Sequence, residues 1–394
     1  MAYPTDTNKR VFYATQAVAV GDIGATGVKD SWYPGVATDF TATSGLCIAH
    51  GLQSIGITTN FNLEQIFELG QLSLYENYEE VPDIEVTFEK VLDGYSLMYH
   101  LGTVSAVSPT LIGRGTARAD VRMAVGLDTG SYMASSENSG VAELYCSGMY
   151  ISSVSYTLGT DGNFTESTTF VGNDKQWISG EESGGLLTNA NGVLNSIFTT
   201  GVFKEDVPVG VDNSVLRRQN LVIGSGGVTY GTGVFVTEIP NIIGTTANTG
   251  NLTNSVFITE ENGPYVQSAS ISVDLARENI QQLGRKAPYY RYISFPVDVT
   301  CDIEVTATAG DNVDASESEK NLSDHSIQFV LDDSTVFQLG KKNKLTSVSY
   351  GGGDAGGGNA TITYSFTNSN DFAVLHSGDP MVMATNTYYK NWFE

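Results

Sequence analysis

Apolar and polar residues alternate along several short segments of the chain. Residues 83–89 and 297–306 alternate most regularly, with Val, Ile, Phe or Cys at every second position and mainly Asp, Glu and Thr between them. Residues 54–61 and 268–275 follow the same rule. Strict alternation is typical of half-buried strands, because successive side chains of a strand point to opposite faces. The pattern therefore predicts sheets with one apolar face and one polar face.

A helical pattern follows two of these strands. Asn62 can cap the segment LEQIFEL, and Gly70 comes directly after it. Asp274 can cap LARENIQQL, and Gly284 comes directly after that segment. Asn and Asp are good N-caps, and Gly is the commonest residue where a helix ends. We therefore predict a short α-helix at each of these two places.

The chain repeats itself. Sliding it by 214 residues places residues 53–82 over residues 267–296, and ten positions match without a gap. The matching pairs are Gln53 and Gln267, Ser54 and Ser268, Ile57 and Ile271, Glu64 and Glu278, Ile66 and Ile280, Leu69 and Leu283, Gly70 and Gly284, Tyr75 and Tyr289, Tyr78 and Tyr292, and Pro82 and Pro296. Later matches keep the same order, including SVSY at 153–156 and at 347–350. Such self-similarity indicates two copies of one module.

The repeat and the alternation together predict a mostly β fold. It consists of two tandem, homologous β-sandwich or partial-barrel modules, each with one short α-helix, over residues 1–180 and 181–394. The abundance of Gly, at 43 residues, fits a fold with many turns. Segments 9–20 and 227–239 add further expected strands. Residues 181–265 match the repeat least well.

Charge and cysteine content narrow the class of protein. The formal net charge of −24 argues against ordinary nucleic-acid binding, which uses Lys and Arg to displace phosphate counterions. The three cysteines are odd in number and scattered, so we expect free thiols in a protein made in the cytosol. Neither a secretory signal nor a transmembrane segment is expected.

The candidate motifs for chemistry are weak. The Gly-rich stretches at 224–233 and 351–358 are followed by expected strands, whereas a phosphate-binding loop needs a helix there. The four histidines are far apart, and no nucleophile elbow occurs. We therefore expect no cofactor, no metal and no enzymatic activity.

Aromatic residues recur in the segments that follow the two expected helices. Each segment carries two tyrosines three residues apart, and aromatic anchors of this kind commonly dominate interfaces. We predict contacts between modules at Tyr75, Tyr78, Tyr289 and Tyr292. Packing within each module is the alternative.

The segments 57–101, 282–305 and 345–372 resemble bacteriophage tail tube proteins. The resemblance lies in the whole pattern of ITTNFNLEQIFELGQLSLYENYEEVPDIEVTF, its echo in the second copy and the closing LTSVSYGGGDAGGGNATITYSF. It implies a structural virion protein, assembled in the host cytoplasm, whose six-fold rings stack into a hollow tube through which DNA is ejected. Duplicated members of the family supply six modules from three chains, so a homotrimeric ring is expected here. Other tail proteins, such as the tape measure, terminator and baseplate, are the implied partners.

The resemblance also suggests a function for the acidic faces of the two strands at 83–89 and 297–306. Their carboxylates must face water, and a negative wall would let DNA slide through a tube without binding specifically. We predict that the lumen is lined by Asp83, Glu85, Glu89, Asp298, Asp302 and Glu304; an outward-facing position is the alternative. Other readings of the whole chain are a baseplate hub or tail terminator, a carbohydrate-binding β-sandwich adhesin, and an enzyme.

Overall fold

The computed structural model describes residues 16–24, 27–29, 45–106, 111–126, 140–179, 215–223, 266–307, 327–331, 333, 335–340, 342–353 and 358–376. The first half of the chain contributes β1 (Gln16–Asp22), β2 (Gly27–Lys29), β3 (Gly45–Ile48), β4 (Leu52–Asn60), β5 (Leu63–Phe67), β6 (Leu74–Glu79), β7 (Asp83–Val91), α1 (Met98–Gly102), α2 (Leu111–Gly115), β8 (Ala119–Gly126), β9 (Gly140–Gly159), β10 (Thr165–Gly172) and β11 (Asp174–Ser179). The second half contributes a 3-10 helix (Arg218–Asn220), β12 (Leu221–Ile223), β13 (Val266–Asp274), β14 (Arg277–Ile280), β15 (Tyr290–Ile293), β16 (Asp298–Thr306), β17 (Gln328–Leu331), β18 (Val336–Gln338), β19 (Lys344–Gly351), β20 (Thr361–Ser369) and β21 (Ala373–Leu375). The prediction of a mostly β fold is confirmed.

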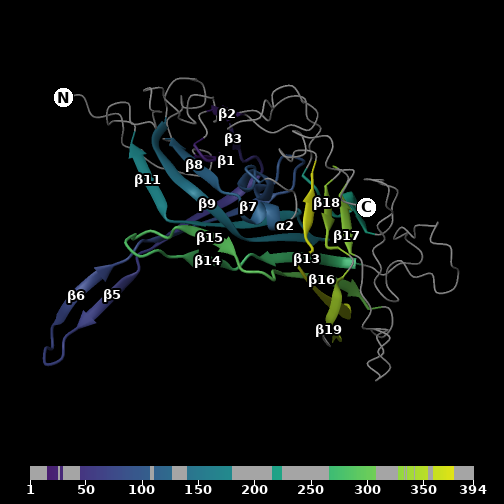
Figure 1. The fold of residues 1–394 in the computed structure, drawn as a ribbon. Helices are drawn as coiled ribbons and strands as arrows, with labels where there is room; N and C mark the ends of the chain where they lie inside the picture. The colour runs from purple at the N-terminus through teal and green to yellow at the C-terminus, as the bar shows by residue number, and fades with distance from the viewer. Residues whose placement is uncertain are drawn as a thin grey trace, which may run out of the picture.

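A long antiparallel sheet runs through both halves of the chain. Its strands lie in the order β4-β7-β10-β9-β13-β16-β20-β19. The first four strands come from the first half and the last four from the second half (Figure 1). We call these the first unit and the second unit. The pairing of β9 with β13 joins them into one central sheet.

The two units share their irregularities as well as their strand order. In the first unit β4 shifts register against β7 at 52–54, and in the second unit β13 shifts against β16 at 266–268. A further bulge falls at Ser152 in β9 and at Thr346 in β19. Each of these two residues directly precedes the sequence Ser-Val-Ser-Tyr. The sequence repeat therefore coincides with two repeated positions in the strand pairing.

Smaller groups of strands lie beside the central sheet. The first part of β9 continues away from it and pairs with β8 and β11, while β1 links β8 to β3 and β2. In the second half, β12, β17, β18 and β21 form a separate four-stranded sheet. One apolar core fills the space between these layers, and α1 lies entirely within it. The apolar faces of both units contribute to this core.

The predicted helices after β4 and β13 are wrong, because both segments form hairpins. β5 pairs with β6, and β14 pairs with β15. Gly70 and Gly284, expected to end helices, instead lie at the hairpin tips with φ of 92° and 82°. A helix end and a tight hairpin both favour a positive φ that glycine adopts freely, so the same residue suits either structure. Among the described residues, the α-helices are α1 and α2, and both lie in the first half.

Several sequence predictions concern residues outside the described ranges. The segment 227–239 is one of them, and so is the module boundary at 180–181. Of the expected strand at 9–20, the described part begins at Gln16 and belongs to β1. The three cysteines are buried thiols that form no disulfide, and burial raises the pKa of the Cys146 thiol to about 12.

Candidate assembly surfaces

One face of the central sheet is covered with hydroxyl groups and carboxylates. The opposite face of the same strands packs into the core, so the polar residues alternate with buried apolar ones. The hydroxyl-bearing residues on the polar face are Ser54 and Thr58 of β4, Thr87 of β7, Thr165, Ser167 and Thr169 of β10, Ser153, Ser155 and Thr157 of β9, Ser268, Ser270 and Ser272 of β13, Thr300 and Thr306 of β16, Thr361, Thr363, Ser365, Thr367 and Ser369 of β20, and Ser347 and Ser349 of β19. This polar face crosses both units without interruption.

Five of the six predicted carboxylates stand on this polar face. Glu85 and Glu89 are exposed on β7, and Asp298 and Asp302 are exposed on β16. Glu304 is half-buried on β16. The structure therefore brings the carboxylates of both halves to the same side of one sheet. Whether this side faces a lumen stays a prediction.

Matched hydrogen bonds hold one carboxylate in each unit. The Ser54 hydroxyl donates to Glu89 at 3.4 Å, and the Ser268 hydroxyl donates to Glu304 at 3.1 Å. Ser54 and Ser268 are a matching pair of the sequence repeat, and each lies at the bulge of its strand. The bulge thus has the same side-chain partner in both halves.

The sixth carboxylate, Asp83, has a different environment. It forms a salt bridge with Arg291 of β15, and the amides of Asn62 and Asn173 donate hydrogen bonds to it at 3.1 and 3.2 Å. Burial alone would raise the pKa of Asp83, but these hydrogen bonds and the Arg291 charge outweigh it and lower the pKa below its ordinary value. Asp83 therefore connects the two halves of the chain.

The four predicted tyrosines are all exposed, by 38% to 63%. Tyr78 lies 5.9 Å from the ammonium group of Lys286 in the second half, which is within the range of a cation–π contact. Tyr289 has a similar contact with Arg285 of its own hairpin, and the Tyr292 hydroxyl donates to Glu278 at 3.0 Å. The role of the tyrosines between modules stays a prediction.

The two hairpins carry exposed apolar residues at their tips. Leu69 and Leu72 of the first hairpin and Leu283 of the second are fully exposed. The β5–β6 hairpin extends well away from the rest of the structure (Figure 1). These exposed apolar side chains make the end of the arm a candidate contact surface for another molecule.

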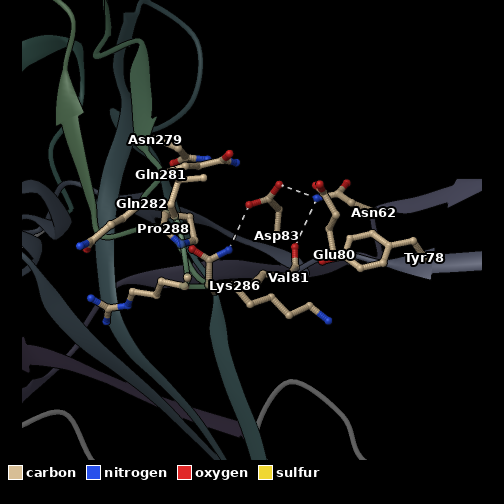
Figure 2. A pocket seen from close by; sticks show the side chains of 14 residues that line it. Asn62, Tyr78, Glu80, Val81, Asp83, Asn279, Gln281, Gln282, Lys286 and Pro288 are labelled. Carbon is tan, nitrogen blue, oxygen red and sulfur yellow. Dashed lines mark hydrogen bonds between the residues drawn. The ribbon is translucent and has the colours of Figure 1, made fainter.

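A polar cavity of about 430 Å³ lies between the base of the β5–β6 hairpin and the tip of the β14–β15 hairpin. Figure 2 shows Asn62, Glu80 and Asp83 on one side of it and Gln282 and Lys286 on the other. Its walls come from both halves of the chain. On one side of the cavity the Asn62 amide donates to the Val81 carbonyl at 3.3 Å and to Asp83 at 3.1 Å, and across it Lys286 lies near the Tyr78 ring. The cavity therefore lies where the two hairpins meet.

The sequence analysis did not predict the buried carboxylate of Glu166, which lies on the core-facing side of the first unit. Glu166 of β10 accepts hydrogen bonds from the backbone N–H groups of Met98 and Tyr99, at 2.7 and 3.0 Å, and from the Tyr156 hydroxyl at 3.0 Å. Burial raises the pKa of Glu166 above its ordinary value despite these bonds. The carboxylate therefore fixes the start of α1 against the sheet. The sequence feature that could have revealed Glu166 is its position, because alternation along β10 places this acidic residue on the face that is otherwise apolar.

A second missed residue is Arg277 of β14. Its guanidinium donates to the carbonyl oxygens of Ile151 at 2.8 Å and of Gly115, and it lies 5.0 Å from the Tyr150 ring. Burial lowers the pKa of Arg277 to about 10. Arg277 corresponds to Leu63 in the repeat. Because the leucine side chain has no hydrogen-bond donor, the repeat gave no sign of this contact between the two halves.

Within the described ranges, no group of three or more His, Cys, Asp or Glu residues is arranged to hold a metal ion. No helix in those same ranges is long and apolar enough to span a membrane.

Comparisons with known proteins give distant likenesses. No family model matches the chain, and no curated protein sequence matches it. Among solved structures, the chain is similar to the tube-terminating cap of the anti-feeding prophage, with 10% identity and a TM-score of 0.27 over 45% of this chain and 93% of that chain. It is also similar to a chain of the anti-feeding prophage baseplate, with 10% identity and a TM-score of 0.27 over 46% of this chain and 99% of that chain. Likenesses this distant do not transfer a function.

Proposed function

We propose that this chain is a non-enzymatic structural subunit of a bacteriophage tail tube. Copies of it assemble into rings, the rings stack into a hollow tube, and DNA passes through the lumen without specific binding. The tape measure, terminator and baseplate proteins of the same tail are its further partners. The protein is assembled in the host cytoplasm and resides in the virion.

The observation that carries the proposal is the serial repetition of a four-strand unit in one sheet. The second unit follows the first with the same strand order and the same bulges. We infer that the two units are copies of one module. A sheet that has already been extended by one unit can be extended by further copies, and rotation between units closes such a series into a ring without edges.

The dimensions of a closed ring suit a DNA channel. Three chains would supply six units and about 24 strands. At ~4.8 Å between strands and a typical tilt, the barrel would have a backbone radius of roughly 24 Å. Side chains would leave a bore of roughly 40 Å, which admits a duplex of about 20 Å with water around it.

The polar face of the central sheet supplies a suitable wall for that bore. It presents Ser and Thr hydroxyls together with carboxylates such as Glu85 and Asp302. A negative, hydrated wall repels phosphates, so DNA can slide past it. The net charge of −24 is consistent with such a wall.

Electron microscopy of the purified full-length chain tests the proposal. Concentrated protein is expected to show ring stacks or tubes with a central bore, in equilibrium with free chains of 42.1 kDa. Discrete rings that never stack would favour a tail terminator instead. A protein that stays a single chain at every concentration, with or without nucleating baseplate, would contradict the proposal.

A further inference from the structure

We infer that the outer edge of β19 pairs with the outer edge of β4 in a second copy of this chain, in the same register that joins β9 to β13 inside the chain. This inference rests on the proposed self-assembly and adds the contact surface and its register. Within the described part of the chain, β4 pairs only with β7, and β19 pairs only with β20. The two edges are therefore the ends of the central sheet.

The internal junction between the units serves as the template. Ile271 lies opposite Tyr156, and Ser272 lies opposite Ser155. The Leu275 N–H donates to the Ser152 carbonyl at 2.8 Å, and the Thr160 N–H donates to the Gln267 carbonyl at 3.0 Å. Since hydrogen-bonded pairs alternate along an antiparallel ladder, Ile271 and Tyr156 form a hydrogen-bonded pair. Ser272 and Ser155 form a pair of the other kind, in which the side chains come closer together.

The free edges are equivalent to the two strands of this junction. β4 holds the same place in the first unit as β13 holds in the second, and β19 holds the same place as β9. The shared bulges fix the alignment to the residue. Ile57 is therefore equivalent to Ile271, and Tyr350 is equivalent to Tyr156. Carrying the internal register over places Ile57 opposite Tyr350 and Thr58 opposite Ser349.

Exposure supports this assignment. Tyr156 is 0% exposed and Leu275 is 2% exposed at the internal junction. Their equivalents at the ends of the sheet, Tyr350 and Phe61, are 54% and 71% exposed. The ends thus leave uncovered the two positions that are covered at the junction. A second copy that repeats the junction would cover both.

The edge strands lack the features that usually prevent such pairing. β4 has nine residues and contains neither a charged residue nor a proline. Monomeric proteins commonly protect long edge strands with lysine, proline or shortening, because unpaired N–H and C=O groups recruit other strands. β19 carries a single lysine, Lys344, at its first position, which leaves Ser347–Gly351 available.

Cysteine cross-linking between two single variants tests the register. Thr58→Cys and Ser349→Cys are purified separately, mixed under assembly conditions and oxidised mildly. Thr58 and Ser349 are exposed and lie on the polar face, so both variants should fold. The three native cysteines are buried and therefore stay out of the reaction. We expect a disulfide-linked dimer of chains in the mixture and at least a tenfold lower yield from either variant alone.

Two controls make the result specific. In the first control, Ser347→Cys replaces Ser349→Cys in the mixture with Thr58→Cys. Position 347 lies on the same face but is diagonal to position 58, and a diagonal separation of about 7–8 Å is too long for a disulfide. Ser155→Cys combined with Ser272→Cys in one chain places thiols at the equivalent internal pair, so it should form an intramolecular disulfide. This second control shows that the pair geometry permits the bond.

The outcomes separate the register from the function. Rings or tubes without the Thr58–Ser349 link, while the internal control links, would overturn the register and leave the proposed function standing. A Thr58–Ser347 link at equal or higher yield would overturn it in the same way. Absence of any assembly would overturn both. The expected link in assembled rings supports the edge pairing directly.

Discussion

Arg291 of β15 and Asp83 of β7 form a salt bridge with 2.5 Å between Nη2 and Oδ1, which ties the second half of the chain to the first. Arg291 also donates to the Asn173 side chain at 3.0 Å. The guanidinium is largely buried, whereas the carboxylate is partly exposed. The contact therefore anchors the second hairpin on the first unit, beside the cavity between the base of the first hairpin and the tip of the second.

Arg291→Gln should reduce the free energy of unfolding by about 1–2 kcal/mol, because hydrogen bonds to charged groups contribute about 1.5–3 kcal/mol and the partly exposed Asp83 carboxylate weakens this pair. Denaturant titration measures the loss. In a double-mutant cycle with Asp83→Asn, the two changes should be less than additive. Glu85→Gln, a change at an exposed residue of the same strand, should stay within about 0.5 kcal/mol of wild type. Additive effects would show that the two side chains do not interact.

The same carboxylate predicts a dependence of stability on pH. The pKa of Asp83 is lower in the folded chain than its ordinary value of 3.8. Its stabilising contribution is therefore present above the ordinary value and is lost as the pH falls through the lower, folded pKa. Urea titrations between about pH 5 and pH 2 should show a shallower loss of stability for Asp83→Asn than for wild type. Equal slopes would argue against a lowered pKa.

Proline placed at two neighbouring positions of β19 should separate assembly from folding. Successive residues of a strand direct their N–H groups to opposite neighbours. By equivalence with Tyr156, the Tyr350 N–H points to the open edge, whereas the Ser349 N–H points to β20. Tyr350→Pro should therefore keep the thermal midpoint of the single chain but abolish ring formation, since an edge strand tolerates proline.

Ser349→Pro is the matched change, and it should lower the thermal midpoint because it removes a bond of the β19–β20 ladder. Circular dichroism and size-exclusion chromatography distinguish the two results. Normal assembly by Tyr350→Pro would mean that this edge is not used.

The leucines at the tip of the first hairpin predict a role in contacts between copies. Leu69→Ser combined with Leu72→Ser should leave the stability of the single chain within about 0.5 kcal/mol of wild type, because both side chains are already fully exposed. The length of assembled tubes, measured in micrographs, should fall. Glu68→Gln at the same tip is the control and should assemble as wild type does. Tubes of unchanged length would show that the tip contacts nothing.

The strands of the central sheet could be predicted from the sequence because alternation reports directly on which face is buried. Residues 84–88 show this, since every second residue there is buried as expected. The hairpins could not be predicted as easily. Leu63 and Ile66 fit a helical stripe, yet they lie on an exposed arm, and the glycine that follows suits both structures.

The candidate surfaces were predictable in part for a similar reason. Carboxylates that alternate with apolar residues along a strand must face water. This rule predicts that Glu85 and Asp302 are exposed, as they are in the structure. The buried bonds of Glu166 and Arg277 depend on residues far apart in the chain, and no local pattern encodes them. The register at the β9–β13 junction is likewise a property of the folded sheet.

A reconstruction of the assembled tube by electron cryo-microscopy tests the central claim most directly. The account predicts three chains in each ring, a continuous barrel built from six four-strand units, and Glu85, Glu89, Asp298, Asp302 and Glu304 pointing toward the axis of the bore. A ring of six full chains, or a barrel whose polar sheet face points away from the axis, would contradict it.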